Sequence, residues 1–192
     1  TLKTVKYSNI CILLIDASKG LDKQDLTIGR MIAGEGRGLI IAANMWDKVE
    51  NKNLVKDKIF YQLQISLSQI KNVPVVFLSG LHGQGVENLL DMIFDVQKKL
   101  NFRISTGKLN RWLTPIIENN PPPLYKGKRN KIRYITQVKI RPPTFAIFMS
   151  SPENLPDSYK RFLISSLMED FGLSGLQIRL RARKGKKTYV DN

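Results

Sequence analysis

Two polar side chains, Asn44 and Asp47, follow the apolar run 39–43 at a spacing of three residues. An unbroken apolar run is typical of a parallel strand that is buried on both faces, and ligands of open α/β sheets bind just beyond the carboxyl ends of such strands. There, Asp47 can accept hydrogen bonds from the ring N–H and the amino group of guanine, while Asn44 holds the loop and can reach the ring. Adenine lacks this pair of donors, and charge-assisted bonds contribute about 1.5–3 kcal/mol each. The pair therefore indicates a carboxylate that can distinguish the two bases.

The same two residues also fit a simpler interpretation, a turn that caps the next helix, because Asn and Asp are favoured in both roles. A second loop bears on the choice. The apolar run 73–78 ends in Ser79-Gly80-Leu81, and the carboxyl ends of parallel strands lie on one rim of a sheet. Two polar loops are thus predicted to converge, and the small Gly80 would let backbone N–H groups approach a ring oxygen closely.

The first part of the chain, residues 1–101, is predicted to alternate between strands and helices. Apolar runs predict strands at 10–15, 38–43 and 73–78, and apolar spacing predicts helices at about 22–32, 53–68 and 86–99, with Asp22 as a capping residue. The residues before position 10 are expected to lead directly into the first strand. Such strand–helix units build one wing of a doubly wound parallel sheet, in which the first strand would expose an unpaired edge.

The second part, residues 102–192, is predicted to be an α+β domain. A helix begins at Ser105 or Thr106 and contains Pro115, which should kink it, and another helix runs over about 156–171. Strands are predicted at 131–140, 144–149 and 176–180. Alternation in the first strand places Ile132, Tyr134, Thr136, Val138 and Ile140 on the buried side and Lys131, Arg133, Gln137 and Lys139 on the solvent side. Helices on one face of a three-stranded sheet are the layout of a small KH-type domain.

Positive charge is concentrated in the second part of the chain. The formal net charge is +15; residues 1–100 contain 13 basic and 10 acidic side chains, whereas residues 101–192 contain 18 and 6. This asymmetry favours a polyanionic partner, most often nucleic acid, over a merely solvated surface. The residues expected to meet RNA phosphates lie on the 131–140 strand and in a basic tail: Lys131, Arg133, Lys139, Arg181, Arg183, Lys184, Lys186 and Lys187.

The sequence lacks the patterns of several common sites. No Gly-x-x-x-x-Gly-Lys-Ser/Thr occurs in it, so no loop is suited to hold β- and γ-phosphates. His82 is the only histidine and lacks a neighbouring cluster of metal-ligating residues, and Cys11 is the only cysteine, so no disulfide can form within the chain. No apolar run approaches the roughly 18–20 residues of a membrane span. These features favour a cytoplasmic protein without a membrane partner.

A KH domain normally holds RNA with a Gly-x-x-Gly loop, and this spacing occurs twice in the chain. Gly80 and Gly83 lie in the first part, outside the predicted KH-type domain. Gly172 and Gly175 link a helix to a strand and are interpreted as a helix end and a turn. RNA contacts are therefore expected on the basic strand and tail instead.

Together, these segments resemble the C-terminal portion of a bacterial family of ribosome-assembly GTPases known as Der or EngA. The first part matches in IDASKGLDKQD, NMWD and SGLHGQGVENLLDMI; the second matches in RISTGKLNRWL, NPPPLYKGKRNKIRYITQVKIRPPTFAIF and SYKRFLISSLMEDFGLSGLQIRL. The resemblance covers nearly the whole chain. It implies that residues 1–101 are the C-terminal half of the second of two G domains, of the doubly wound P-loop GTPase class, and that residues 102–192 are a KH-like domain with a basic C-terminal tail.

The resemblance also implies a ligand and roles for single residues. GTP or GDP would bind, with the family's Asn-Lys-x-Asp motif at Asn44 and Asp47, and Ser79 and Gly80 would support the base. Met45 replaces the lysine of that motif; it keeps apolar cover over the base and loses the ammonium, so weaker guanine binding is expected. In the intact family member Mg²⁺ assists GTP hydrolysis, but its ligands and the P-loop are not among these residues. The 192 residues alone are therefore expected to be inactive.

The partners that the resemblance implies are the large ribosomal subunit and its rRNA, together with an N-terminal G domain that this sequence does not contain. Two alternatives stay open. One is a non-catalytic RNA- or ribosome-binding module with a vestigial nucleotide fold. The other is a protein docking element whose sheet packs on another G domain, although the basic side chains argue against docking as its only role.

Overall fold

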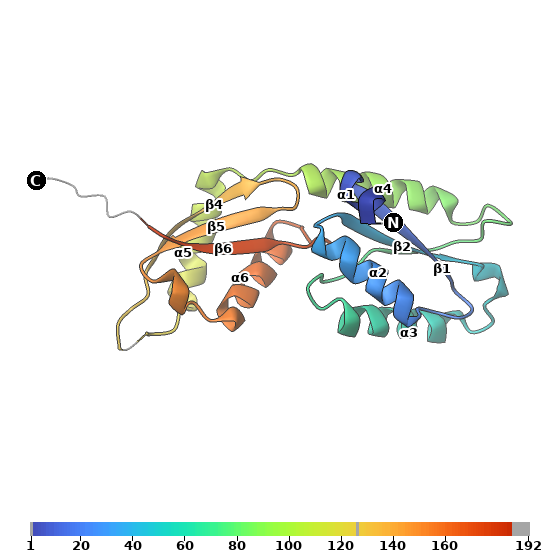
Figure 1. Cartoon of the computed structure of the whole chain (residues 1–192), viewed down its shortest axis with the longest axis horizontal. Helices are drawn as coiled ribbons and strands as arrows, with labels where there is room; N and C mark the ends of the chain where they lie inside the picture. Colours follow the sequence, from blue (N-terminus) through green and yellow to red (C-terminus); the bar gives the residue numbers. More distant parts are fainter. Residues whose placement is uncertain (1, 126, 186–192) are drawn as a thin grey trace, which may run out of the picture. The chain divides into compact units, whose positions relative to one another are not determined.

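Each of the two units in this chain is built around a three-stranded sheet (Figure 1). The computed structural model describes residues 2–125 and 127–185. Unit 1 contains the described residues up to 102 together with 172–177, and unit 2 contains residues 103–171 together with the described residues from 178 on. Among the described residues, no helix is long and apolar enough to cross a membrane.

The sheet of unit 1 is parallel, and its most apolar strand lies in the middle. Its strands, in the order in which they pair, are β1 (Ile10–Asp16), β2 (Gly38–Asn44) and β3 (Val75–Phe77). Both pairs are parallel, and every residue of β2 before Asn44 is buried. The prediction of three parallel strands is therefore confirmed, and both polar loops follow strands that end on the same rim.

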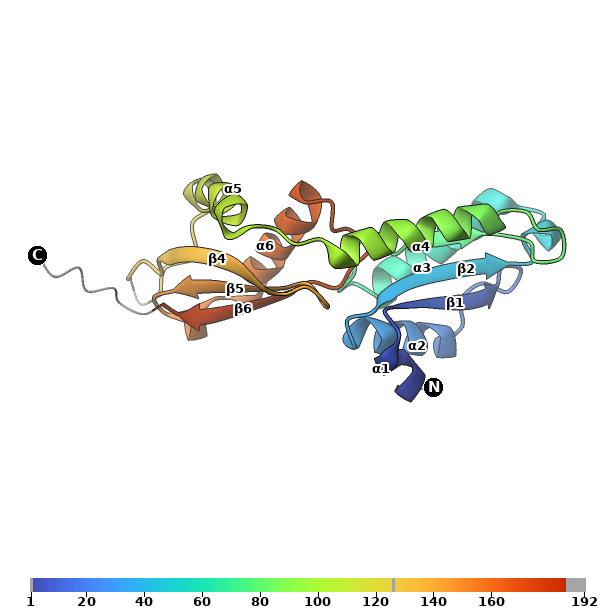
Figure 2. The same cartoon turned by 90° about the horizontal axis from the view of Figure 1, so that it is seen from above.

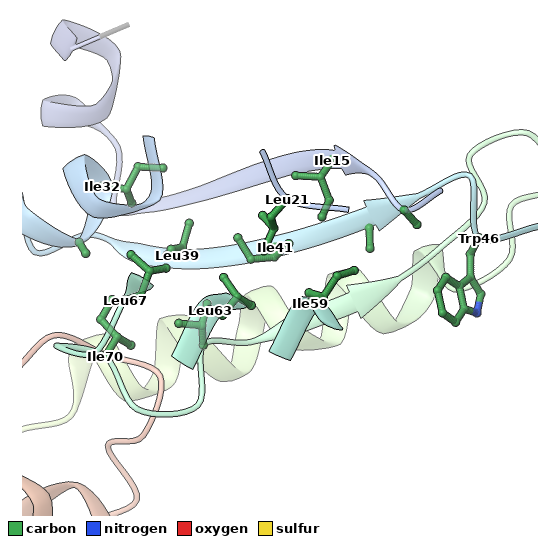
Figure 3. Close-up of a cluster of buried hydrophobic side chains, with 14 of the residues drawn as sticks. Ile15, Leu21, Ile32, Leu39, Ile41, Trp46, Ile59, Leu63, Leu67 and Ile70 are labelled. Atoms are coloured by element: carbon green, nitrogen blue, oxygen red, sulfur yellow. The ribbon is translucent and has the colours of Figure 1, made fainter. Parts of the chain in front are cut away.

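Helices cover both faces of β2 and bury alternate residues of it. The helices of unit 1 are α1 (Leu2–Tyr7), α2 (Lys23–Gly34), α3 (Lys52–Ser66) and α4 (Val86–Asn101), and a short 3₁₀ helix, η1 (Trp46–Lys48), follows β2. Leu39 and Ile41 join the core that includes α2 and α3 (Figure 3). Ile40 and Ala42 join a second core that includes α4. This two-sided burial explains why the strand sequence is an unbroken apolar run.

Helix α1 differs from the expectation that the first residues lead directly into a strand. Its Val5 side chain is 6% exposed and belongs to the α2–α3 core. The guanidinium of Arg37 also donates a hydrogen bond to the carbonyl of Lys6. A helix of six residues contains too few positions to show an apolar period, so sequence periodicity does not detect it.

The outer edge of β1 is bare in the described part of the chain. β1 pairs with β2 alone, and its Ile12 and Leu14 side chains are 44% and 61% exposed. Phe94 of α4 is also exposed. Apolar side chains and unpaired backbone groups therefore reach solvent along β1, as expected for an unpaired first strand.

Unit 2 has the predicted α+β layout. Its elements are α5 (Thr106–Asn119), β4 (Ile132–Lys139), β5 (Thr144–Met149), η2 (Pro152–Asn154), α6 (Asp157–Asp170) and β6 (Arg179–Lys184). The strands lie in the order β4-β5-β6, with an antiparallel and then a parallel pair. Both α5 and α6 lie on the same side of this sheet (Figure 2). Ser105 caps α5 by accepting a hydrogen bond from the N–H of Lys108, as predicted.

Helix α5 protects the outer edge of β4 with a side chain. The amide of Asn110 accepts from the N–H of Ile135 and donates to its carbonyl, both at 3.0 Å. A single side chain thus satisfies the two backbone groups that a further strand would have paired. The two helices are also joined, because the indole of Trp112 donates to Asp170 at 2.7 Å.

The predicted alternation in β4 is wrong for three residues. Tyr134 and Val138, assigned to the buried side, are 41% and 42% exposed, whereas Gln137, assigned to the solvent side, is buried. Ile132 is buried, and Lys131, Arg133 and Lys139 are exposed, as predicted. The pairing with β5 shifts by one residue between Ile132 and Tyr134, and again between Gln137 and the end of the strand. Such a bulge moves the following side chains to the opposite face, so a strict alternation from Ile132 assigns the wrong side.

The predicted position of the last strand is also wrong. β6 runs over Arg179–Lys184 instead of residues 176–180, so Arg181, Arg183 and Lys184 belong to a strand and not to a tail. The alternation of Leu180 and Ala182 with arginines has the period of a strand. This alternation is short and lies within a run of mostly charged residues, so the sequence-based prediction missed the strand.

Candidate functional site

A hydrogen bond joins the two polar loops at the carboxyl rim of unit 1. The side-chain Oδ1 of Asn44 accepts from the backbone N–H of Gly80 at 2.8 Å. Backbone bonds on either side support it, since Leu78 N–H donates to the Ala43 carbonyl at 2.9 Å and Trp46 N–H donates to the Leu78 carbonyl at 3.1 Å. The loop after β2 is therefore attached to the loop after β3.

This arrangement differs from the simpler interpretation of a helix cap. Met45 precedes the 3₁₀ helix η1, and no side chain caps that helix. The oxygen of Asn44 is used across the rim, toward Gly80, and not for the helix that follows it.

Ser79 connects the second loop to the carboxylate of Asp47. The Ser79 side chain is fully buried, and its Oγ accepts from the backbone N–H of His82 at 3.3 Å. Hydrogen bonding by the Ser79 side chain to Asp47 is the main reason why the pKa of Asp47 lies below its ordinary value, against the opposing effect of burial. The positive potential of His82 and Lys48 adds smaller contributions in the same direction. Asp47 is thus ionised at neutral pH and exposed at the rim.

Met45 and Trp46, between the two polar residues, play opposite structural roles. Met45 is 38% exposed and has a left-handed backbone, with φ of 59°, which costs a residue with a Cβ about 1–2 kcal/mol. Trp46 is 7% exposed and packs against Phe77, with ring centroids 4.4 Å apart. The ammonium of Lys56 lies 5.8 Å from the Trp46 ring centroid. Trp46 anchors the loop to the core; its position as the aromatic residue between Asn44 and Asp47 was the available signal, which the sequence-based prediction missed.

Glycines give the second loop its shape. Gly85 has φ of +77°, and a Cβ there would lie 2.4 Å from the carbonyl oxygen of Phe77, so only glycine fits. Gly80 is different, because a Cβ would meet Asn44 Oδ1 at 3.5 Å, an ordinary contact. An alanine at position 80 is therefore compatible with the rim.

The rim can supply a charged double acceptor. The exposed carboxylate of Asp47, held from behind by Ser79, fits the two neighbouring N–H donors of a guanine edge. Within the described residues, no group of three or more His, Cys, Asp or Glu side chains could hold a metal ion.

The basic residues predicted to contact RNA lie in unit 2, as far as they are described. Lys131, Arg133 and Lys139 are exposed on or beside β4, and Arg181, Arg183 and Lys184 are exposed on β6. Lys186 and Lys187 lie outside the described residues. The pairing β4-β5-β6 places the two basic strands on either side of β5.

The Gly172–Gly175 segment ends a helix and packs within unit 1. Gly172 has a left-handed backbone directly after the cap residue of α6, Phe171. The N–H of Gly175 donates to the carbonyl of Lys71 at 2.7 Å. The segment thus uses its backbone to hold the turn before β3.

Two protein families match consecutive parts of the chain. Residues 1–99 match the elongation factor Tu GTP binding domain. Residues 103–183 match the KH-domain-like domain of EngA bacterial GTPase enzymes, which is C-terminal in those proteins.

Curated relatives match along the whole chain. The GTPase Der of Rickettsia canadensis is 41% identical over 192 residues, which cover 98% of this chain and 43% of the relative. The GTPase Der of Parvibaculum lavamentivorans is 40% identical over 191 residues, which cover 100% of this chain and 40% of the relative. The chain thus spans less than half the length of these relatives.

Among solved structures, Era of Aquifex aeolicus bound to GDP·AlF4⁻ is 13% identical to this chain, with a TM-score of 0.43. The match covers 94% of this chain and 66% of the Era chain. That likeness is too weak to support a conclusion. From the two family matches and the relatives that are 40% and 41% identical, the chain belongs to the Der (EngA) family of GTPases and corresponds to a C-terminal portion of it, part of a GTP-binding domain followed by the KH-like domain.

Proposed function

We propose that residues 1–101 are the C-terminal half of a G domain that recognises guanine, and that residues 102–192 are a KH-like domain that binds RNA. The intact protein would be a GTPase that acts in ribosome biogenesis, in the assembly of the large subunit. Its partners would be the large subunit with its rRNA and a further G domain. GTP and GDP would be its nucleotides.

The observation that supports guanine recognition best is the connection between the two rim loops. Asn44 binds the backbone of Gly80 at 2.8 Å, and Ser79 supports the carboxylate of Asp47. In this arrangement Asp47 accepts from the guanine ring N–H and amino group, while Gly80 and the neighbouring backbone face the base oxygen. Met45 covers the base without the charge that a lysine would bring, which predicts weaker binding.

Phosphate and Mg²⁺ binding are assigned to parts of the protein that this sequence does not include. The 192 residues contain no P-loop motif, and Mg²⁺, when bound, neutralises the phosphate charge during hydrolysis. These residues would therefore select the base but not cleave the nucleotide.

Nucleotide titration of the protein as its gene encodes it tests this proposal. Two charge-assisted bonds to Asp47 predict that GTP binds more than about 100-fold tighter than ATP. In Asp47→Asn the preference should move to XTP, because the amide can donate to the xanthine 2-oxo group. Equal affinities for GTP and ATP would contradict the role of Asp47.

A second candidate function is a non-catalytic RNA- or ribosome-binding module with a vestigial nucleotide fold, which the net positive charge of unit 2 favours. Two observations distinguish the candidate functions. An enzyme requires Gly-x-x-x-x-Gly-Lys-Ser/Thr encoded upstream of Thr1, and it requires measurable GTP hydrolysis. Either reading predicts RNA binding whose affinity falls steeply with salt concentration. A flat salt response would mean that the basic residues are only solvated surface.

A further inference from the structure

The side of the unit 2 sheet that faces away from α5 and α6 carries an ordered row of side chains. Tyr134 of β4 pairs with Phe148 of β5, and Phe148 pairs with Arg183 of β6. Two residues earlier on β6, Arg181 pairs with Ala146. Directly paired residues project to the same face of a sheet. We call this surface the aromatic–arginine face.

Burial shows that this face is the open one. Ile135 and Ile147, which alternate with the row, are completely buried, and α5 and α6 lie together on one side of the sheet (Figure 2). Tyr134 is 41% exposed, and Arg181 and Arg183 are exposed as well. The helices therefore cover the side of Ile135 and Ile147, and the row faces solvent within unit 2.

The two aromatic rings on this face are stacked. The centroids of Tyr134 and Phe148 lie 4.4 Å apart, with 10° between the ring planes. A cross-strand aromatic pair stabilises a sheet by itself, and that contribution needs no ligand. The exposure of Tyr134, however, leaves aromatic surface in water on an edge strand, separated from the arginines of β6 by Phe148 of β5. An exposed aromatic ring of this kind can stack a nucleic-acid base.

The arginines supply the second part of a nucleic-acid site. Arg181 and Arg183 lie two residues apart on one strand, a rise of about 6.6 Å, which is comparable to the separation of successive phosphates in an extended single strand. Among the described residues, no acidic side chain forms a salt bridge with either of them. A guanidinium binds phosphate with two parallel hydrogen bonds.

We propose that the aromatic–arginine face binds single-stranded RNA, with a base stacked on Tyr134 and successive phosphates on Arg181 and Arg183. A duplex does not fit this chemistry, because its bases are already stacked and the major groove of an RNA helix is too narrow for side chains. Positive charge in the row favours a polyanion over a protein partner. This inference rests on the proposed RNA binding of unit 2 and adds where and how RNA binds.

Fluorescence anisotropy with a labelled oligoadenylate of about ten nucleotides tests the stacking contact in the full chain. Tyr134→Ala should weaken binding about 10-fold, whereas Tyr134→Phe, which keeps the ring, should stay within about 2-fold. Tyr134→Leu keeps an apolar contact with Phe148 and loses the aromatic face, so it should resemble Tyr134→Ala. Because Leu retains packing and Phe retains stacking, the pair separates base binding from sheet stability.

The arginine contacts are tested by the salt dependence of binding. Replacing Arg181 and Arg183 together by Gln should reduce the slope of log affinity against log salt by about 1.4, two contacts at about 0.7 each for single strands. Arg161→Gln is the matched control, because Arg161 is exposed on α6, on the helix side of the sheet, and should leave the oligoadenylate contacts intact.

Three results would overturn the proposal. The first is that Tyr134→Leu binds oligoadenylate as tightly as the native chain does, and the second is that a duplex of the same length binds with equal affinity. The third is that Tyr134→Ala keeps its RNA binding and loses the binding of another protein instead. If no variant or native chain binds RNA in a salt-dependent way, the proposed RNA function itself fails. Guanine recognition is measured separately and is unaffected by either outcome.

Discussion

The two sheets of this chain differ in where side chains are exposed to ligands: at the strand ends in unit 1 and on one face of the sheet in unit 2. In unit 1, helices cover both faces of β2, so its candidate polar side chains lie at and just beyond its carboxyl end, at Asn44 and Asp47. In unit 2, both long helices lie on one side, so side chains within the strands, such as Tyr134 and Arg183, reach solvent directly. A site at a rim depends on how its loops are joined, whereas a site on a face depends on strand register. Changes to loop backbone and changes to strand pairing should therefore affect the two units separately.

The largest effect is expected from Gly85→Ala in the loop after β3. A Cβ at this position would lie 2.4 Å from the Phe77 carbonyl oxygen, in a backbone with φ of +77°. The loss of unfolding free energy of unit 1 should exceed the roughly 1–2 kcal/mol that a left-handed backbone costs alone. Trp46 lies in unit 1 and Trp112 in unit 2, so urea unfolding followed by fluorescence in a Trp112→Phe background reports unit 1.

Gly83→Ala provides the control for that variant. Gly83 has φ of +69°, and a Cβ there meets nothing within 4 Å, so only the backbone cost should appear, about 1–2 kcal/mol. Equal destabilisation by the two substitutions would mean that the contact with Phe77 does not shape the rim.

The next effect, in unit 2, is expected from Asn110→Ala at the edge of β4. The substitution removes both bonds to the backbone of Ile135, each 3.0 Å long, and should cost about 1–3 kcal/mol because part-buried backbone groups lose their partners. Asn110→Asp keeps an acceptor for the Ile135 N–H and should cost less. Urea unfolding followed by Trp112 fluorescence in a Trp46→Phe background measures both.

The same variant also compares the two sheet edges. Within the described residues, β1 pairs with β2 alone and exposes Ile12 and Leu14, whereas β4 is protected by Asn110. Loss of that protection should increase self-association of the chain, measured by light scattering. If Asn110→Ala neither destabilised unit 2 nor increased association, the side chain would not protect the edge.

The parallel sheet of unit 1 was predictable because its physical cause is local in sequence. Two-sided burial requires an unbroken apolar run, and the run before Asn44 shows it. The convergence of Asn44 and Ser79 on one rim follows from parallel topology. The bond from Ser79 to Asp47 was not predictable, since it depends on the conformation of two loops that are distant in sequence. The left-handed backbone of Met45 gives no signal either, because methionine rarely adopts it.

Unit 2 was predictable in its order of elements but not in which side chains face solvent. A bulge after Ile132 moves Tyr134 to the open side, and bulges depend on the partner strand as well as on the strand itself. The strand around Arg181 was hidden because basic residues on an edge strand resemble a charged tail. The aromatic–arginine face therefore became visible only when the strand register was known.

A smaller effect is expected from Tyr159→Phe, which tests a connection between α6 and the end of α5. The Tyr159 hydroxyl donates to the Asn120 carbonyl at 2.6 Å, and its loss should cost unit 2 about 1 kcal/mol in urea unfolding. Burial raises the pKa of Tyr159 from 10.0 to about 12. Because the neutral form is favoured in the folded state, its contribution to stability is full below about pH 10 and is lost as the pH rises toward 12.

Tyr159→Phe should remove that part of the alkaline pH dependence of unit 2 and leave unit 1 as it was. An identical alkaline profile in the variant and the native chain would exclude Tyr159 as its source. The comparison is informative because the phenylalanine keeps the buried ring and changes only the hydroxyl.

The smallest effect concerns the carboxylate at the rim and is measured as a pKa. In Ser79→Ala the pKa of Asp47 should rise, because the hydrogen bond from Ser79 is the first cause of its lowering and burial acts in the opposite direction. The contribution of Asp47 to stability is present above its ordinary pKa and lost as the pH falls through the lowered value, so the variant should lose it at a higher pH. Carbon NMR titration of the side-chain carboxyls measures the shift, with Asp16 as an internal control, since its pKa is lowered first by Ser18. An unchanged pKa of Asp47 would mean that Ser79 does not join the two loops, and the order of the rim would then depend on the bond between Asn44 and Gly80 and on the two backbone bonds of Leu78.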